Sequence, residues 1–153
     1  MQIAQPGIVV ISPDGECLMI VEVKLSDIVL HKPIAIEQLK CLMLSRNCSI
    51  GVLVFGERII LLRDSLEESN GASIHIVGEA QLPYSLLPPA DYQWKGEIEF
   101  ESRIQRWLEE LKFSSSTEKL PDDLRKLFGE PIINLLRLGE VRAAGPRWSK
   151  ATQ

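Results

Sequence analysis

The sequence is poor in the residues that mark several common classes of protein. It has three cysteines, Cys17, Cys41 and Cys48, without CxxC spacing, and each is expected to be a buried, reduced thiol among aliphatic neighbours. No apolar run reaches the roughly 20 residues that a membrane helix needs. The N-terminus also lacks the charged and then apolar layout of a signal peptide. These absences predict a cytoplasmic protein without a membrane partner.

Positive charge is also in short supply. Lys and Arg number 17 against 21 Asp and Glu, which gives a formal net charge of -4. No global positive field therefore draws the chain to nucleic acid, and a nucleic-acid partner would need a local basic strip. The chain has no glycine-rich phosphate loop. Neither His31 nor His75 has a serine or cysteine beside it in a recognisable nucleophile arrangement.

What is present is an ordinary globular composition. The chain has 153 residues, of which 45% are hydrophobic and 25% charged, and this suits one domain. Residues 1–82 read as a sheet-rich core, and residues 86–146 read as a helical extension. Because the helices need a sheet to cover their apolar faces, we expect residues 1–153 to form a single domain of the α/β (α+β) class.

The expected elements follow from apolar periodicity and from proline and glycine signals. Two hairpins are expected, the first around a Pro-Asp-Gly turn, and a further strand follows them. Three helices are expected in the second half, the last ending before Gly145-Pro146. In chain order the expected elements are strands Ile8–Ile11 and Cys17–Lys24, helix Pro33–Ser45, strands Ile50–Phe55, Arg58–Arg63 and Ser73–Gln81, helix Glu97–Phe113, and helices from Pro121 to near Gly129 and from Pro131 to Ala144.

The informative stretch is Glu22-Val23-Lys24, at the end of the second expected strand. Residues two apart in a strand share a face, so Glu22 and Lys24 point the same way. Such a carboxylate and ammonium could hold a divalent cation and position a water on phosphate, although magnesium usually needs more than one carboxylate. The alternative is a surface ion pair that keeps one face of the sheet soluble.

The surrounding sequence, from Pro6-Gly7 through Ile8–Ile11 and Cys17–Lys24, resembles the core hairpin of the PD-(D/E)xK nuclease superfamily. It is most similar to the N-terminal nuclease domain of type I restriction R subunits. The resemblance continues through Ile36-Glu37-Gln38-Leu39-Lys40 and then Ser49–Leu62, and so covers about the first 63 residues.

This resemblance implies a restriction-endonuclease-like mixed sheet with a covering helix after the ExK strand. It implies Mg²⁺-dependent phosphodiester cleavage, with Glu22 as metal ligand and Lys24 as electrostatic helper. Gln38 would reach toward the active site. Its helix neighbours at three and four residues are apolar or small, so we expect it on the core side, where a purely structural, hydrogen-bonded glutamine is the alternative.

The family pattern fails at its aspartate. Asp14 lies in a literal Pro-Asp, but a turn centred on Asp14-Gly15 places Ser12 opposite Cys17 and Gly7 opposite Glu22. Asp14 would then lie roughly 20 Å from Glu22 along the strand, which is too far for two ligands of one cation. Gly7 therefore stands where the family has its aspartate. The family's first helix, which carries another acidic residue, also has no counterpart before Gly7.

Three functional hypotheses follow. The leading one is a degenerate nuclease-fold protein that acts as a binding or assembly module on a protein partner, a second copy or nucleic acid, with little or no cleavage. The second is a Mg²⁺-dependent DNA endonuclease whose second carboxylate is relocated, from Glu37, from Asp14 or from another subunit. The third is an interaction module that docks a protein through Ile98–Phe113. Arg142, Arg147 and Lys150 could touch phosphate or form a solvated tail.

Overall fold

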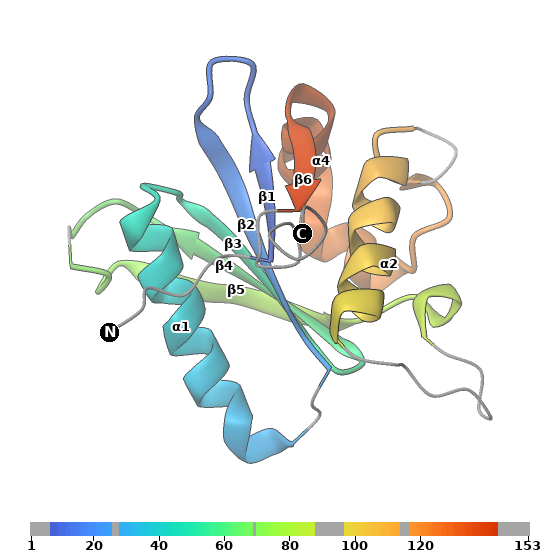
Figure 1. Ribbon diagram of the computed structural model, residues 1–153, viewed down its shortest axis with the longest axis horizontal. Helices are drawn as coiled ribbons and strands as arrows, with labels where there is room; N and C mark the ends of the chain where they lie inside the picture. The colour runs from blue at the N-terminus through green and yellow to red at the C-terminus, as the bar shows by residue number, and fades with distance from the viewer. Residues whose placement is uncertain (1–6, 26–27, 69, 88–96, 114–116, 144–153) are drawn as a thin grey trace, which may run out of the picture.

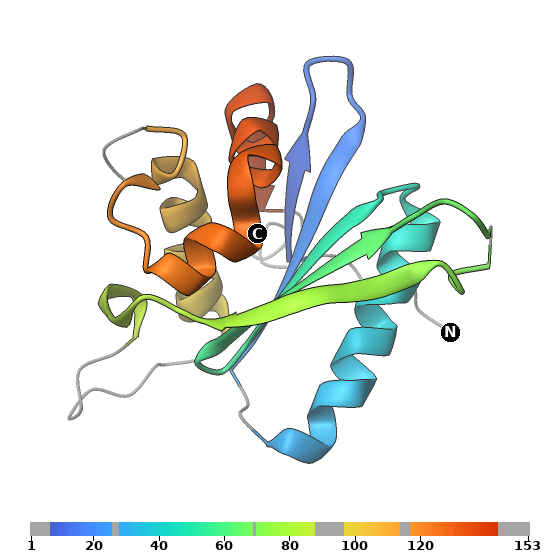
Figure 2. The same cartoon turned by 180° about the vertical axis from the view of Figure 1, so that it is seen from behind.

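A six-stranded mixed sheet forms the centre of the molecule, with helices on both faces. The structure is a computed structural model that describes residues 7–25, 28–68, 70–87, 97–113 and 117–143. Helix α1 covers one face, and helices α2 and α4 cover the other (Figure 1 and, from behind, Figure 2). The expected α+β class with a mixed sheet and a helix after the second strand is therefore confirmed.

The sheet has the strand order β5-β4-β3-β2-β1-β6. Strands β2 and β3 run parallel, and every other neighbouring pair is antiparallel. The runs of Val, Ile and Leu suit the interior of the sheet, and all residues of β3 are buried because helices cover both of its faces. The strands are β1 (Ile8–Ile11), β2 (Cys17–Lys24), β3 (Ile50–Phe55), β4 (Arg58–Asp64), β5 (Ile74–Gln81) and β6 (Glu140–Ala143).

Helix α1 (Lys32–Ser45) makes the crossover between the parallel strands β2 and β3, after a short 3-10 turn, η1 (Val29–His31). Proline near its first turn is favourable because the missing N–H is not needed there. The helix buries Ala35, Leu39, Leu42 and Met43 against the sheet. It approaches β3 closely at Gly51, where a Cβ would lie 2.6 Å from Sδ of Met43.

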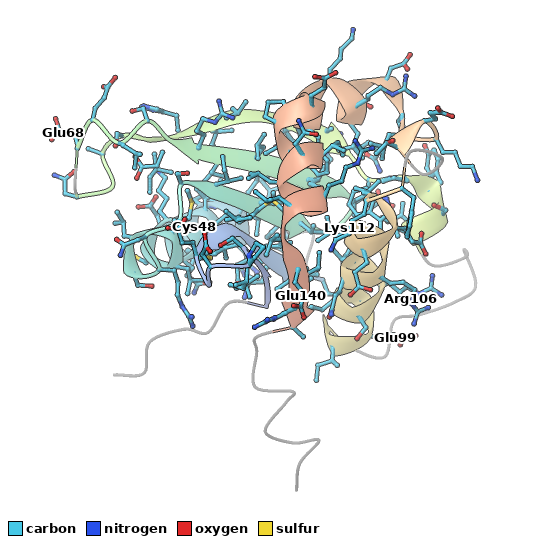
Figure 3. All side chains as sticks on the ribbon, turned by 90° about the horizontal axis from the view of Figure 1, so that it is seen from above. Cys48, Glu68, Glu99, Arg106, Lys112 and Glu140 are labelled. Atoms are coloured by element: carbon cyan, nitrogen blue, oxygen red, sulfur yellow. The ribbon has the colours of Figure 1, made fainter. Side chains whose placement is uncertain are left out.

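Helices α2 (Glu97–Glu110) and α4 (Asp122–Leu138) build the second layer, after the short turn η2 (Tyr84–Leu86). Trp107 and Phe128 join the two helices, with ring centroids 6.1 Å apart. Beyond the end of α2, Lys112 donates a 2.7 Å hydrogen bond to the carbonyl of Gly139, just before β6. Figure 3 labels Lys112 and Glu140, the first residue of β6. Helix α4 breaks at Gly129, which has φ 61°, so the expected division into two helical segments at this point is confirmed.

The expected end of the last helix and the expected burial of two of the cysteines are wrong. The last helix ends at Leu138 rather than Ala144, because Glu140–Ala143 pair with β1 and add a sixth strand to the sheet. Cys41 is exposed on α1 and Cys17 is only partly buried, whereas Cys48 is buried as expected.

Within the ranges that the structure describes, no helix has the length and apolarity needed to span a bilayer.

Candidate functional site

Glu22 is a buried carboxylate near the carboxyl end of β2. Its exposure is 8%, and Oε1 accepts a 2.8 Å hydrogen bond from the backbone N–H of Gly7. Burying an ionised carboxylate costs several kcal/mol unless hydrogen bonds or opposite charge compensate it. A buried acid at this position is therefore held in place by the chain entering β1, and it is not a freely solvated surface group.

Lys24 follows Glu22 on the same face of β2 and is partly exposed. It is the last residue of the strand and pairs with Phe55, the last residue of the parallel strand β3. The N–H of Gly56 donates to the Lys24 carbonyl at 2.9 Å, which fixes the two strand ends together. Carboxyl ends of adjacent parallel strands are a favoured place for ligands in open sheets.

The pairing of β1 with β2 shows which of two residues, Gly7 or Asp14, lies beside Glu22. Ile8 pairs with Val21, which confirms the expected register at this end and leaves Gly7 next to Glu22. The expected pair of Ser12 with Cys17 is wrong, because the register shifts after Val10 and Cys17 pairs with Ile11. Asp14 is exposed in the turn at the far end of the hairpin, so it is not a second ligand beside Glu22.

A second carboxylate reaches Gly7 from helix α2. A Cβ built on Gly7 would lie 3.1 Å from both Cδ and Oε1 of Glu101, and Oε1 of Glu101 is shielded from solvent. The Glu101 carboxylate thus occupies the space that any side chain at position 7 would enter. With standard backbone geometry, these contacts bring the carboxylates of Glu22 and Glu101 within roughly 8 Å of each other.

Sequence reasoning missed Glu101 as a site residue. The available signal was a glutamate on the apolar side of an amphipathic helix, between the buried Phe100 and Ile104. A carboxylate among apolar residues indicates a polar partner or a functional role, because glutamate is seldom buried without compensation. The helix pattern alone does not reveal its neighbour, since Gly7 lies at the other end of the sequence.

The remaining predicted residues lie elsewhere. Gln38 is exposed on α1, so its expected position on the core side is wrong, and its role at the site stays a prediction. Glu37 is also exposed and forms a 3.2 Å ion pair with Lys40, one turn along the helix. It does not supply the relocated carboxylate at Glu22. His31 and His75 are both exposed.

Of the three basic C-terminal residues singled out in the sequence, the structure describes only Arg142. Arg142 forms a 3.0 Å ion pair with Glu140 within β6, and both side chains are more than half exposed. The Glu140 pair holds the pKa of the Arg142 guanidinium above its usual value. Arg147 and Lys150 lie outside the described residues, as does Pro6.

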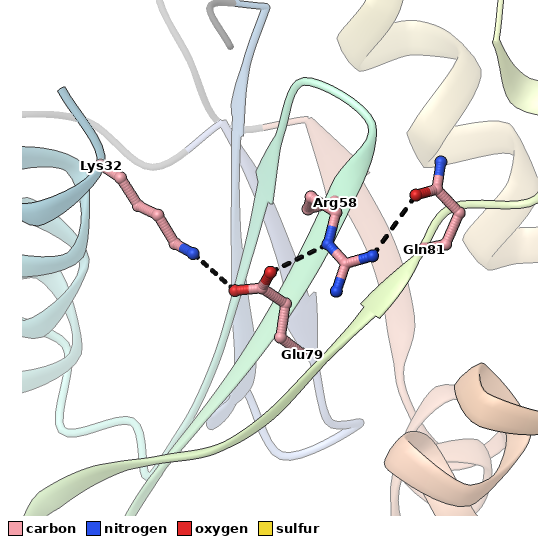
Figure 4. A network of polar contacts seen from close by, with 4 residues as sticks. All are labelled: Lys32, Arg58, Glu79 and Gln81. Carbon is pink, nitrogen blue, oxygen red and sulfur yellow. Dashed lines mark hydrogen bonds and ion pairs between the residues drawn. The ribbon is translucent and has the colours of Figure 1, made fainter. Parts of the chain in front are cut away.

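A second polar cluster borders the carboxyl end of β3. Glu79 on β5 accepts from Lys32 Nζ at 2.6 Å and from Arg58 Nε at 2.8 Å, and Arg58 also contacts Gln81 at 3.4 Å (Figure 4). The hydrogen bond from Lys32 is the main reason that the pKa of Glu79 is lowered, with a further contribution from Arg58. Lys32, Arg58 and Glu79 line a pocket of about 300 Å³ with Phe55 at its wall.

In the described part of the chain, no group of three or more His, Cys, Asp and Glu side chains is placed to hold a metal ion. The candidate site instead consists of two carboxylates around Gly7, with Lys24 beside one of them. Neither a family model, nor a curated protein, nor a solved structure matches this chain. The argument for function therefore depends on the chemistry of these residues.

Proposed function

We propose that this protein is a restriction-endonuclease-like, Mg²⁺-dependent nuclease in which Glu101 replaces the carboxylate that Gly7 lacks. One observation carries the proposal: Glu22 and Glu101, from β2 and α2, both meet the same glycine. The sequence pattern favoured a degenerate site because position 7 has no side chain. With Glu101 in that space, the second of the hypotheses, a relocated carboxylate, is the better supported.

The order of elements supports the restriction-endonuclease-like part of the proposal. A hairpin carrying Glu22 and Lys24 leads through α1 to a parallel strand and a second hairpin, in the order that the sequence resemblance implies. The resembling family usually begins with a helix that carries another acidic residue. We propose that α2 takes that role here, from the C-terminal half of the chain, with Glu101 as its acidic residue.

The residues present fit a hard divalent cation. Such ions take oxygen ligands and commonly use one or two carboxylates, with water and substrate phosphate completing the shell. Glu22 and Glu101 would hold the ion, which when bound would polarise a phosphoryl oxygen and lower the pKa of a bound water. Gly7 orients Glu22 through its N–H.

Lys24 contributes a positive charge on the same face as Glu22. A lysine there can bind a phosphate oxygen and stabilise the negative charge that develops as the phosphodiester is attacked. The second polar cluster adds little to this, because Lys32 and Arg58 both pair with Glu79. With a net charge of -4, the chain depends on the metal and on Lys24 to attract a polyanion, so its affinity for DNA is expected to be low. Because so few phosphate contacts release few counterions, that affinity should depend only weakly on salt.

A cleavage assay tests the proposal. The wild-type chain is expected to nick or linearise supercoiled plasmid in Mg²⁺ or Mn²⁺. Lys24→Ala and Glu22→Gln should each reduce the rate by about a hundredfold or more, the first because it removes positive charge at the phosphate and the second because it removes a charged metal ligand. Glu110→Gln is the matched control, because Glu110 is exposed at the end of the same helix that carries Glu101.

Two results would contradict the nuclease assignment. One is the absence of metal-dependent cleavage on double- and single-stranded DNA. The other is a cleavage rate that Lys24→Ala leaves unchanged, which would indicate a contaminating nuclease.

A binding or assembly module is the second candidate function. The observation that favours it is an exposed apolar segment where α1 begins: Val29 is 77% exposed, Leu30 83% and Ile34 60%. Contiguous exposed apolar side chains commonly mark a protein interface. If this candidate is correct, the chain binds a protein through this segment and does not cleave DNA, and charged substitutions at Val29 and Leu30 abolish the association.

A further inference from the structure

Cys17 and Cys48 form a thiol pair that the proposed nuclease chemistry does not use. Cys17 is the first residue of β2, and Cys48 lies two residues before β3. The parallel register pairs Ile20 with Gly51, and the same register continued by three residues places Cys17 opposite Cys48. Neighbouring strands lie about 4.8 Å apart. This separation falls within the Cα–Cα range of disulfides, about 4.4–6.8 Å.

The side chains of the pair lie on the same side of the sheet. Cys48 belongs to the core between the sheet and α1, and Cys17 packs against that core. The two thiols lie close enough together that each shifts the pKa of the other. Each thiol also lies near the backbone carbonyl of the residue two positions later in the chain: Met19 for Cys17 and Ile50 for Cys48. Both thiols are free in this structure.

We propose that Cys17 and Cys48 are a redox modification site, at which a small-molecule disulfide oxidant joins them in a reversible disulfide between β2 and β3. Cys17 is the attacking thiol because it is partly exposed, whereas Cys48 is buried behind it. The hydrogen bond with Cys48 holds the pKa of Cys17 below its usual value, with the nearby Arg46 acting in the same direction. The same hydrogen bond and burial raise the pKa of Cys48.

The exchange proceeds in two balanced steps. The Cys17 thiolate attacks one sulfur of the oxidant, which forms a mixed disulfide and releases one small-molecule thiolate. Cys48 then gives up its proton and attacks the sulfur of Cys17, which releases the second. The two protein thiols are oxidised by two electrons, the oxidant is reduced to two thiols, and the two protons from the protein thiols end on them. A thiol reductant reverses both steps.

Tryptic mapping tests this directly because the three cysteines fall in three separate peptides, residues 1–24, 41–46 and 47–58. The full-length chain is equilibrated with oxidised glutathione, quenched with acid and an alkylating agent, and digested without reductant. The expected product is peptide 1–24 joined to peptide 47–58, with Cys41 alkylated. Dithiothreitol should separate the two peptides. The thermal midpoint of the oxidised chain should rise by roughly 5–10 °C, because the bridge closes a long loop in the unfolded chain.

Cys41→Ser is the control background, since it removes the exposed thiol and leaves the pair. In that background Cys17→Ser should abolish the cross-link and the rise in thermal midpoint. Cross-links through Cys41, a stable glutathione adduct on Cys17 with Cys48 still free, or two reduced thiols at high oxidant would each overturn the proposal. None of these readouts involves nucleic acid or metal, so the result is independent of the proposed nuclease activity.

Discussion

The Glu101 carboxylate occupies the space that a side chain at residue 7 would need, so a substitution at Gly7 is expected to destabilise the protein. Restoring the aspartate of the resembling family by Gly7→Asp would push a second carboxylate against Glu101, whose Oε1 lies 3.1 Å from the new Cβ. Without metal, we expect the free energy of unfolding to fall by about 1–3 kcal/mol from crowding and like charge. Urea denaturation with and without Mn²⁺ measures this.

The paired test of this prediction is the double variant Gly7→Asp/Glu101→Ala, which returns the carboxylate to the hairpin and clears its space. We expect the double variant to be more stable than Gly7→Asp alone. Equal stability of the two variants would show that Glu101 does not occupy the space beside residue 7.

Glu79 links two strands and a helix through charge, and this gives a dependence of stability on pH. Its folded-state pKa is lowered, chiefly by Lys32, so the ion pairs contribute fully above the ordinary pKa of a glutamate. Their contribution is lost as the pH falls through the lowered folded-state pKa. Because the side chains are partly exposed, it amounts to at most about 1 kcal/mol.

The corresponding experiment is urea denaturation of wild type and Glu79→Gln from about pH 6 to about pH 3, a window that spans glutamate titration. The difference between the two proteins should be largest near pH 6 and shrink toward pH 3. A difference that grows as the pH falls would contradict the assigned direction of the pKa shift.

At the scale of elements, helix α1 packs closely on β3 at Gly51. A Cβ at Gly51 would lie 2.6 Å from Sδ of Met43 and 3.2 Å from two carbons of Leu39. Gly51→Ala is therefore expected to cost about 1–3 kcal/mol of unfolding free energy. In a Met43→Ala background the same substitution should cost clearly less, because the nearest atom has been removed. Equal costs in both backgrounds would show that the packing at Gly51 is loose.

Most elements of the fold were predictable because their signals are local. The hairpin of β1 and β2, helix α1 and the hairpin of β3 and β4 follow from apolar runs bounded by turn residues. Strand β6 was not predictable. Glu140–Ala143 is too short to show a period, and the segment becomes a strand because β1 offers it a free edge.

Of the candidate site, only the residues on the first hairpin, Glu22, Lys24 and Gly7, were predictable from the sequence. Glu22 and Lys24 share a strand, so their spacing fixes their relation. The register of the hairpin then identified Gly7 as the neighbour of Glu22. Glu101 could not be found in this way, because its approach to Gly7 depends on how α2 packs over the sheet, and that packing is a tertiary property. Gln38 failed for a related reason: both faces of α1 carry apolar residues, and only docking on β3 decides which face is buried.

At the scale of the whole molecule, the two halves of the chain depend on each other. Helices α2 and α4 bury Phe100, Ile104, Trp107 and Phe128 against the sheet, while β6 covers its edge at β1. The proposed site also needs both halves of the chain, because Glu22 lies in the first half and Glu101 in the second. We therefore expect a fragment ending near residue 87 to lose both its fold and any affinity for metal.

Binding of Mn²⁺ by the full-length chain tests the central claim most directly, because it needs no substrate. Titration followed by the electron paramagnetic resonance signal of free Mn²⁺ should show one site in wild type and in Glu110→Gln. Glu101→Gln and Glu22→Gln should each weaken binding by about tenfold or more, which corresponds to a loss of at least about 1.4 kcal/mol. Far-ultraviolet circular dichroism checks that each variant is folded. No binding by the wild type, or equal binding by wild type and Glu101→Gln, would contradict the assignment of Glu101 as the second carboxylate.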